Sequence, residues 1–231
     1  LILDMDAQGH TGVSLNSQSV KDMYSFLVEG IDYSECITHL GDSLDIITSN
    51  ETLTKAGIML SRQEDSEFLL REKIKEIKGY DYIILDCSPS LGLLNQNALL
   101  ASNEAIIPTS MDALGYDSLK KIVSMIQNLN EVFKHDCRIS RIIPTMYDRR
   151  LRTSKQILEK VTNDFYGVVT DPIYICSKLK EAPEKGKSIF KYAPNSTAAK
   201  DYWKIVESII QEERSFNNVK NAELKAVAAK A

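Results

Sequence analysis

The sequence predicts an α/β fold in which a doubly wound, mostly parallel sheet carries helices on both faces. Short apolar runs alternate with longer segments whose apolar residues recur at helical spacing, which is the pattern of such a sheet. The clearest run, Ile83-Ile84-Leu85, is typical of a strand buried on both faces. Asp86 follows it at once, at the carboxyl end of the strand, where open α/β sheets bind ligands. An ordinary buried strand that ends in a turn aspartate is consistent with the same residues.

The remaining elements follow from the same periodicities. Gly30 is a helix stop, Ser49-Asn50 cap the helical stretch that follows them, and β-branched residues mark the strands. We expect strands at residues 1–3, 44–48, 83–85, 104–109, 138–145 and 168–175, and helices at 19–30, after 50, and at 65–78, 91–101, 116–133, 153–165 and 198–213. These elements form one domain over residues 1–214. A composition rich in Asn, Lys and Ala predicts a mobile tail over residues 215–231.

Composition is that of an ordinary soluble globular protein. The 231 residues are 43% hydrophobic and 26% charged, and no segment approaches the length of a membrane span. The four cysteines, Cys36, Cys87, Cys137 and Cys176, are scattered, which predicts buried thiols and argues against a metal site or a disulfide framework. The net charge of −4 excludes a protein that is basic overall but allows a local basic face.

A second acidic strand end lies at the start of the chain. Leu1-Ile2-Leu3 is already the core of a strand, so we expect further sequence upstream. Asp4 and Asp6 follow, and two carboxylates one residue apart point to the same side of a strand that stays extended. Such a concentration of negative charge favours a bound cation, although a charged strand-to-loop junction has the same residues.

Together these stretches resemble the ParA/MinD family of deviant-Walker P-loop ATPases, and its ParA branch in particular. Leu1–Gly9 is similar to that branch's switch I strand, apolar-Asp-x-Asp-Pro-Gln-Gly, with Ala7 in place of Pro. Tyr80–Asp86 resembles the Walker B strand, and Cys87–Gly92 resembles switch II, with Ser88 in place of Pro. The resemblance continues in order to about residue 212, through Leu94–Leu99, Ile107-Pro108-Thr109, Leu179–Pro183 and Gly186–Ile189.

The resemblance implies an ATP hydrolase that uses ATP and Mg²⁺, and it implies a role for each matched residue. Asp86 would hold Mg²⁺ through water, and Asp6 would orient the attacking water. Asp4 would support the metal shell, although by itself it could equally be a structural carboxylate. Pro89 and Gly92 would let switch II follow the γ-phosphate.

Two further features concern the nucleotide. Tyr147 and Asp148 resemble the family's adenine-proximal segment, although a strand-end Tyr-Asp is also a common turn. The family's phosphate loop belongs upstream, in a strand–loop–helix unit, and Gly186-Lys187-Ser188 does not replace it, because Glu181 stands where that loop needs glycine. We therefore expect the 231 residues alone to lack ATPase activity, and the predicted function is that of the complete protein.

Charge is distributed unevenly along the chain. The window 149–191 holds ten Lys/Arg against five Asp/Glu, a net charge of +5, and the remainder holds 18 against 27, a net charge of −9. Solvated helix and loop faces account for many such windows. ParA-type proteins bind nonspecific DNA through basic residues in their C-terminal part, so the resemblance implies a DNA-binding face at Arg149, Arg150, Arg152, Lys178, Lys180 and Lys187.

The predicted function is therefore a ParA-type ATPase that dimerises with ATP, binds nonspecific DNA and segregates or positions a cargo, whether plasmid, chromosome or protein body. Its partners would be a second copy, DNA and an ATPase-stimulating adaptor, ParB-like or specific to the cargo. Its place would be the bacterial cytoplasm, at the nucleoid.

Three alternatives stay open. One is a MinD-like positioning ATPase, although the segment 219–227 has too few bulky apolar groups for membrane anchoring. Another is an interaction module of the same fold that does not hydrolyse ATP, and a phosphate loop in the upstream sequence would exclude it. The third is a reductase like the nitrogenase iron protein, for which the cluster cysteines are not evident and which an iron assay would detect.

Overall fold

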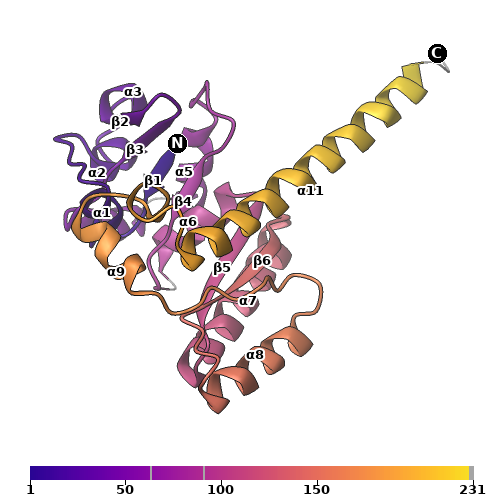
Figure 1. Cartoon of the computed structure of the whole chain (residues 1–231). Coiled ribbons are helices and arrows are strands. Elements are labelled where there is room, and N and C mark those ends of the chain that lie inside the picture. Colours follow the sequence, from indigo (N-terminus) through magenta and orange to yellow (C-terminus); the bar gives the residue numbers. More distant parts are fainter. Residues whose placement is uncertain (63, 91, 229–231) are drawn as a thin grey trace.

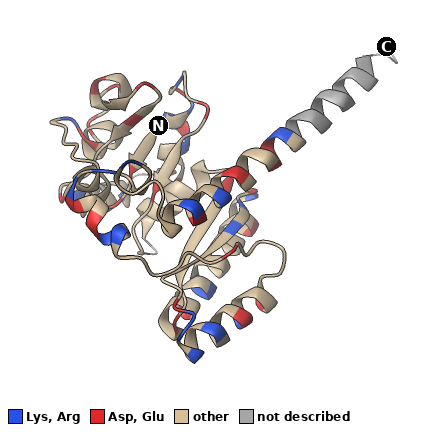
Figure 2. Cartoon of the chain, viewed as in Figure 1, with Lys and Arg blue, Asp and Glu red and all other residues tan. Residues whose placement is uncertain are grey.

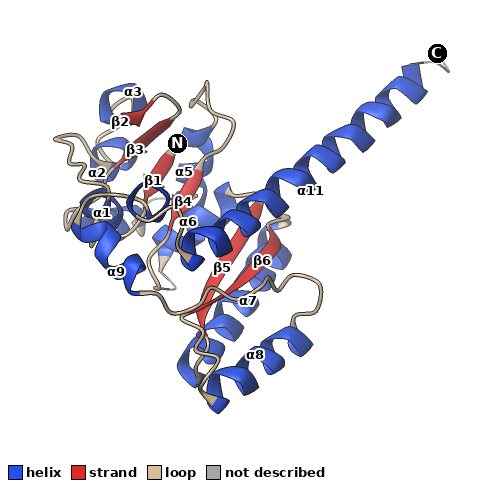
Figure 3. Ribbon diagram, in the orientation of Figure 1, coloured by secondary structure: helices blue, strands red, loops and turns tan. Residues whose placement is uncertain are grey.

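The structure, a computed structural model, describes residues 1–62, 64–90 and 92–228, with side chains as far as Ser215. Its strands form a four-stranded sheet in the order β2-β3-β1-β4 and a two-stranded sheet of β5 and β6 (Figure 3). The strands are β1 (Ile2–Asp4), β2 (Thr38–Gly41), β3 (Leu44–Ile47), β4 (Ile84–Asp86), β5 (Glu104–Ser110) and β6 (Arg138–Thr145). Helices cover the sheets, which confirms the predicted α/β class (Figure 1).

The four-stranded sheet is parallel at its centre. β1 pairs in parallel with β3 on one side and with β4 on the other, and β2 adds an antiparallel edge to β3. Leu3, Ile47, Phe26 and Leu70 are buried in the core beneath it. The helices of this part are α1 (His10–Ser14), α2 (Met23–Leu27), α3 (Tyr33–Cys36), α4 (Leu53–Leu60), α5 (Leu69–Ile74), which a short 3-10 turn (Ser66–Phe68) precedes, and α6 (Leu93–Ala101).

A second core lies around β5, β6, α7 (Ala113–Phe133) and α8 (Arg152–Asp164), where Leu119, Ile126, Ile142 and Val161 are buried. The strand predicted at residues 168–175 is wrong. That segment forms two isolated bridges, one between Val169 and Ile142 of β6 and one between Tyr174 and Tyr147, which follows β6. Asp171-Pro172 lies between the bridges, and proline has no N–H to donate to a ladder.

The chain then returns to the first sheet and ends in a long helix. α9 (Ser177–Glu184) packs beside α1, and α10 (Ile189–Tyr192) leads to α11 (Thr197–Ala228) (Figure 1). Glu212 of α11 accepts hydrogen bonds from Arg138 and Arg141 and so fastens α11 to β6. Because α11 runs past residue 215, no helix end marks the predicted start of the tail, and the mobility of that tail stays a prediction. None of the helices in the described residues is both long and apolar enough to cross a membrane.

The expectation that the β4 strand is buried on both faces is wrong. Ile84 is 58% exposed, and Ile106 of β5 is 45% exposed. In the part of the chain that the structure describes, no ladder joins β4 to β5, so each strand has an unpaired edge (Figure 3). A strand that pairs on one side only leaves backbone groups and apolar side chains open to solvent. Two apolar edges therefore lie between the two sheets.

Candidate functional site

The parallel pairing of β1 and β4 brings two of the predicted aspartates together. Asp4 and Asp86 are partners in the register of the two strands, and the Met5 amide donates to the Asp86 carbonyl at 2.8 Å. Both residues lie at the carboxyl ends of their strands and therefore at the same edge of the sheet.

Asp4 is a buried carboxylate that lacks a full set of partners. Its side chain is 0% exposed, and one oxygen accepts a hydrogen bond from the Asp6 amide at 3.2 Å. The other oxygen, Oδ2, has no hydrogen-bond partner among the described residues. Burial raises the pKa of Asp4, and the negative charge of Asp86 raises it further. A buried carboxylate of this kind is costly to keep ionised unless a cation or donor compensates it.

Replacement of Asp4 by Asn is expected to stabilise the complete protein at neutral pH when metal and nucleotide are absent. Since the folded state holds the Asp4 proton more tightly than the unfolded chain, native stability falls as pH rises from the unfolded pKa through the raised one. Asp4→Asn removes that loss, so its melting temperature should exceed that of the parent at pH 7–8 by a few degrees, at about 2–4 °C per kcal/mol. The difference should shrink as pH approaches the unfolded pKa.

Thermal melts in EDTA across pH 5–8 measure this effect, and an exposed Asp42→Asn variant is the matched control. An Asp4→Asn variant that is less stable at every pH would show that the carboxylate is a structural hydrogen-bond acceptor.

Asp6 lies in the turn after β1 and not on an extended strand. One of its carboxylate oxygens accepts from the Gln8 amide at 3.0 Å, and its carbonyl accepts from the Gly9 amide at 2.9 Å. Gly9 is left-handed, with φ 62°, and a Cβ there would lie 2.3 Å from the Ser49 carbonyl oxygen. The strand does not stay extended to Asp6, because β1 ends at Asp4 and a tight turn carries Asp6, so the two carboxylates do not share one side of a strand.

Asp86 has a hydrogen-bond partner that the sequence did not predict. The hydroxyl of Thr11, on α1, donates to Oδ2 of Asp86. Thr11 follows the quoted switch I stretch by two residues, but only the fold brings it to β4.

The carboxylates fit Mg²⁺ as part of a larger ligand set. Asp4 offers an oxygen without a partner, and Asp86 offers its second oxygen, Oδ1. Within the residues that the structure describes, no three His, Cys, Asp or Glu side chains converge as a complete metal cage. Mg²⁺ is commonly held by one or two carboxylates together with water and phosphate oxygens, which matches this partial set.

A side-chain amide shapes the loop after β4. Asn95, buried on α6, donates to the Ser88 carbonyl at 2.6 Å and to the Ser90 carbonyl. Pro89 lies exposed between these two residues, and Gly92 caps the start of α6. Leu91, where a helix was expected to begin, lies outside the described residues. Asn95 lies in Leu94–Leu99, one of the stretches that resemble the family, yet nothing in the sequence indicated its contact with the loop.

Tyr147 and Asp148 follow β6, in the second sheet. Tyr147 is buried and packs edge-on against Tyr174, with 5.3 Å between ring centroids. Asp148 accepts two hydrogen bonds from Arg150, at 2.9 and 2.7 Å, which lower the pKa of Asp148 to about 2. The turn interpretation therefore accounts for Asp148, and a nucleotide role for either residue stays a prediction.

The predicted basic residues fall into two groups (Figure 2). The first group, Arg149, Arg150 and Arg152, lies at the start of α8, and the second, Lys178, Lys180 and Lys187, lies on α9 and the loop after it. All six side chains are exposed. Lys178 pairs with Glu181 at 2.8 Å, and this hydrogen bond is the main cause that lowers the pKa of Glu181 to about 2. The residues thus form two separate patches.

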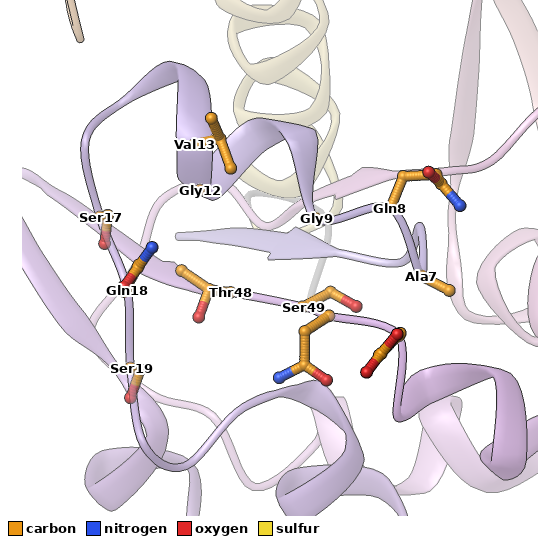
Figure 4. A pocket seen from close by; sticks show the side chains of 12 residues that line it. Ala7, Gln8, Gly9, Gly12, Val13, Ser17, Gln18, Ser19, Thr48 and Ser49 are labelled. Atoms are coloured by element: carbon orange, nitrogen blue, oxygen red, sulfur yellow. The ribbon is translucent and has the colours of Figure 1, made fainter.

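A polar cavity of about 560 Å³ lies between the loop after β1 and the end of β3 (Figure 4). Hydroxyl and amide side chains dominate its wall, including those of Gln8, Ser17, Thr48 and Ser49. None of the three aspartates of the site is among its lining residues. The cavity therefore lies beside the carboxylates and does not contain them.

Comparison with known proteins identifies the family of this chain. A family profile described as an AAA domain matches residues 1–139. The sporulation initiation inhibitor protein Soj of Bacillus subtilis is 31% identical over 215 residues, which cover 90% of this chain and 85% of that protein.

Solved structures share the fold. A putative plasmid partition protein from Borrelia burgdorferi, bound to AMPPNP, has a TM-score of 0.79 at 24% identity and covers 91% of this chain and 86% of its own. Cobyrinic acid a,c-diamide synthase from Mycobacterium smegmatis, with a bound ATP analogue and magnesium, has a TM-score of 0.77 at 23% identity and covers 93% and 82%. Since these likenesses are below 25% identity, they concern the fold, and the sequence relatives decide the family. The chain belongs to the ParA/MinD family of P-loop ATPases, among the proteins that partition or position cargo.

Proposed function

We propose that the complete protein hydrolyses ATP with Mg²⁺ at the edge formed by β1 and β4. The observation that carries this proposal is the registered pair of Asp4 and Asp86 at the carboxyl ends of parallel strands, with one Asp4 oxygen lacking a partner. That solved structures of this fold hold an ATP analogue and magnesium supports the choice of ligands.

Each carboxylate has a distinct role in this proposal. With Mg²⁺ bound, Asp86 would accept hydrogen bonds from water on the metal, and the buried Asp4 would help to balance the charge of the metal. Asp6, on the turn after β1, would accept a hydrogen bond from the attacking water and so orient it. Mg²⁺, when bound, would neutralise charge on the phosphate oxygens, so most of the catalysis would come from positioning and electrostatics.

The unpaired edges of β4 and β5 support a place for the phosphate loop. Ile84 and Ile106 expose apolar surface along these edges, which one further parallel strand would cover. A strand inserted there would end beside Asp86 and would deliver the loop after it to the carboxylate edge. We propose that the family's strand–loop–helix unit occupies this place in the complete protein.

The finer proposal is that ATP pairs two copies, and that the pair binds nonspecific DNA and is released when an adaptor stimulates hydrolysis. The two basic patches support it, because a dimer would present each patch twice and so gain effective concentration on DNA. Cargo would be moved along the nucleoid by repeated cycles of binding and release.

The test uses the purified complete protein. Slow, Mg²⁺-dependent ATP hydrolysis is expected, with ATP-dependent dimers in light scattering and an iron content near zero. A protein that binds ATP but does not hydrolyse it would be an interaction module, and stoichiometric iron would indicate a reductase. Either result would overturn the proposal.

Removal of the α9 patch, through Lys178→Ala, Lys180→Ala and Lys187→Ala together, should weaken binding to random duplex DNA and leave ATP affinity unchanged. Each phosphate contact releases counterions, so the plot of log affinity against log salt should become less steep by about 2–3. The affinity of the parent for DNA should be higher with ATP than with ADP.

Fluorescence anisotropy across a salt series measures these effects. A triple replacement of exposed Lys55, Lys121 and Lys134 controls for net charge, and replacement of Arg149, Arg150 and Arg152 tests the second patch separately. If the α9 variant and the control lose affinity equally, the α9 patch has no specific role.

A further inference from the structure

A single hydroxyl holds the carboxylate that the proposed function assigns to the metal. Thr11 Oγ1 donates to Asp86 Oδ2. Of the side chains that the structure describes, that of Thr11 alone forms a hydrogen bond with the Asp86 carboxylate. Oδ1 of the same group therefore stays available, and its direction depends on the bond that Thr11 makes.

Two glycines fix the position of α1, the helix that carries Thr11, against the segment that follows β3. The left-handed Gly9 starts the helix, and the Gly9 carbonyl accepts from the Val13 amide at 3.2 Å. Gly12 is buried against β3, where a Cβ would lie 3.0 Å from both the Ser17 carbonyl oxygen and Thr48 Cγ2. A side chain at Gly9 would collide with the Ser49 backbone, and one at Gly12 would require its neighbours to move by a few tenths of an ångström, so both positions keep α1 close to the segment after β3.

The C-terminal part of the chain fixes α1 from the other side. α9 packs beside α1. The loop after α9 lies close to Asn16, two residues beyond the end of α1. Gly186 has φ 61°, and a Cβ there would lie 2.7 Å from Cβ of Asn16. α1 thus contacts α9 on one side and the segment after β3 on another, and the Thr11 hydroxyl that it carries donates to Asp86.

The geometry points to Thr11 as the positioning residue for Asp86: its hydroxyl fixes one carboxylate oxygen so that the other faces the water bound to Mg²⁺. This role rests on the proposed function. Groups that orient metal-binding carboxylates typically change metal affinity or activity by about 10- to 100-fold when they are lost. The hydrogen bond from Thr11 favours one rotamer of Asp86, whose side chain is exposed in the described structure.

The test is a magnesium titration of the complete protein with a fluorescent, non-hydrolysable ATP analogue. Thr11→Val keeps the shape of the side chain and removes the donor, so the Mg²⁺ concentration at half-saturation should rise about 10- to 100-fold. Thr11→Ser keeps the donor and should remain within about threefold of the parent, a margin near the thermal energy. Thr54→Val, on an exposed face of α4, makes the same replacement away from the site and should change nothing.

A double-mutant cycle with Asp86→Asn separates positioning from a general structural effect. If Thr11 acts through Asp86, Thr11→Val should raise the half-saturation much less in the Asp86→Asn background. Melting temperatures without metal should agree between Thr11→Val and Thr11→Ser within about 2–4 °C, the span of 1 kcal/mol.

The outcomes separate this inference from the proposed function. Unchanged magnesium dependence in Thr11→Val, or an equal rise in the Asp86→Asn background, overturns the positioning role while Mg·ATP binding by the parent stands. A parent that binds no Mg·ATP overturns both. If Thr11→Val does not fold, the titration is made with Thr11→Ala, for which the same rise is expected.

Discussion

Replacement of Asp86 by Asn is expected to raise the Mg²⁺ concentration needed for ATP binding by about 10- to 100-fold in a protein that stays folded. The reason is the position of the side chain. Asp86 ends β4 in register with Asp4, and its exposed carboxylate supports no apolar packing. Its loss therefore removes an acceptor for metal-bound water without leaving a cavity in the core. Calorimetric titration of the complete protein with Mg·ATP measures the change.

A matched control lies in the same segment. Asp81 is exposed before β4, and Asp81→Asn removes the same charge without touching the carboxylate edge. Circular dichroism of both variants should match that of the parent. Equal Mg·ATP affinity for Asp86→Asn and Asp81→Asn would show that Asp86 does not serve the metal.

Most strands could be predicted because their signal, an apolar run that ends at polar residues, is local and lies in consecutive residues. β5 and β6 were predicted to within a residue or two, and so was the start of β4. The β2 strand was missed, because Thr38–Gly41 is short, half-polar and formed only by its antiparallel pairing with β3. The strand expected at 168–175 failed for the opposite reason. Its residues favour a strand, but proline at its centre prevents a continuous ladder with β6.

The burial of a strand depends on its neighbours, which a single run cannot reveal. Ile83-Ile84-Leu85 has the composition of a doubly covered strand, yet β4 pairs with β1 alone in the described residues. β4 thus carries apolar side chains that the observed sheet leaves exposed. That exposure is consistent with one more strand beside β4, which is also what the exposed side chain of Ile106 on β5 suggests.

The strand-end positions of Asp4 and Asp86 could be predicted because each directly follows an apolar run, and the roles of these residues and of Asp6 stay predictions. The supporting contacts of the site could not be predicted, since they join residues far apart in the chain. The Thr11 hydroxyl meets a carboxylate 75 positions away, and Gly186 meets Asn16 across 170 positions. The basic residues show a second limit of prediction from the sequence. One window of sequence predicted a single face, and the fold places its members at the start of α8 and on α9 with the loop after it (Figure 2).

Replacement of Asp6 by Ala is expected to slow ATP hydrolysis by the complete protein about 10²- to 10⁴-fold while nucleotide affinity stays within a few fold. Asp6 lies on the turn after β1, two residues beyond the buried Asp4, where its carboxylate can orient water without being part of the metal shell. The variant should still bind ATP but should hydrolyse it very slowly, so it should accumulate as an ATP-bound dimer that stays on DNA.

Single-turnover hydrolysis, nucleotide titration and light scattering with ATP separate these effects, and Asp4→Asn supplies the contrast. Loss of Asp4 should weaken magnesium-dependent binding, because its carboxylate balances the metal charge from a fully buried position. Loss of Asp6 should leave binding and remove turnover, because its carboxylate acts on the attacking water. Since the two aspartates are separated by one residue, a shared structural disturbance would affect both measurements in both variants. If Asp6→Ala hydrolyses ATP as fast as the parent, the attacking water is oriented by another group, and the turn after β1 has only a structural role.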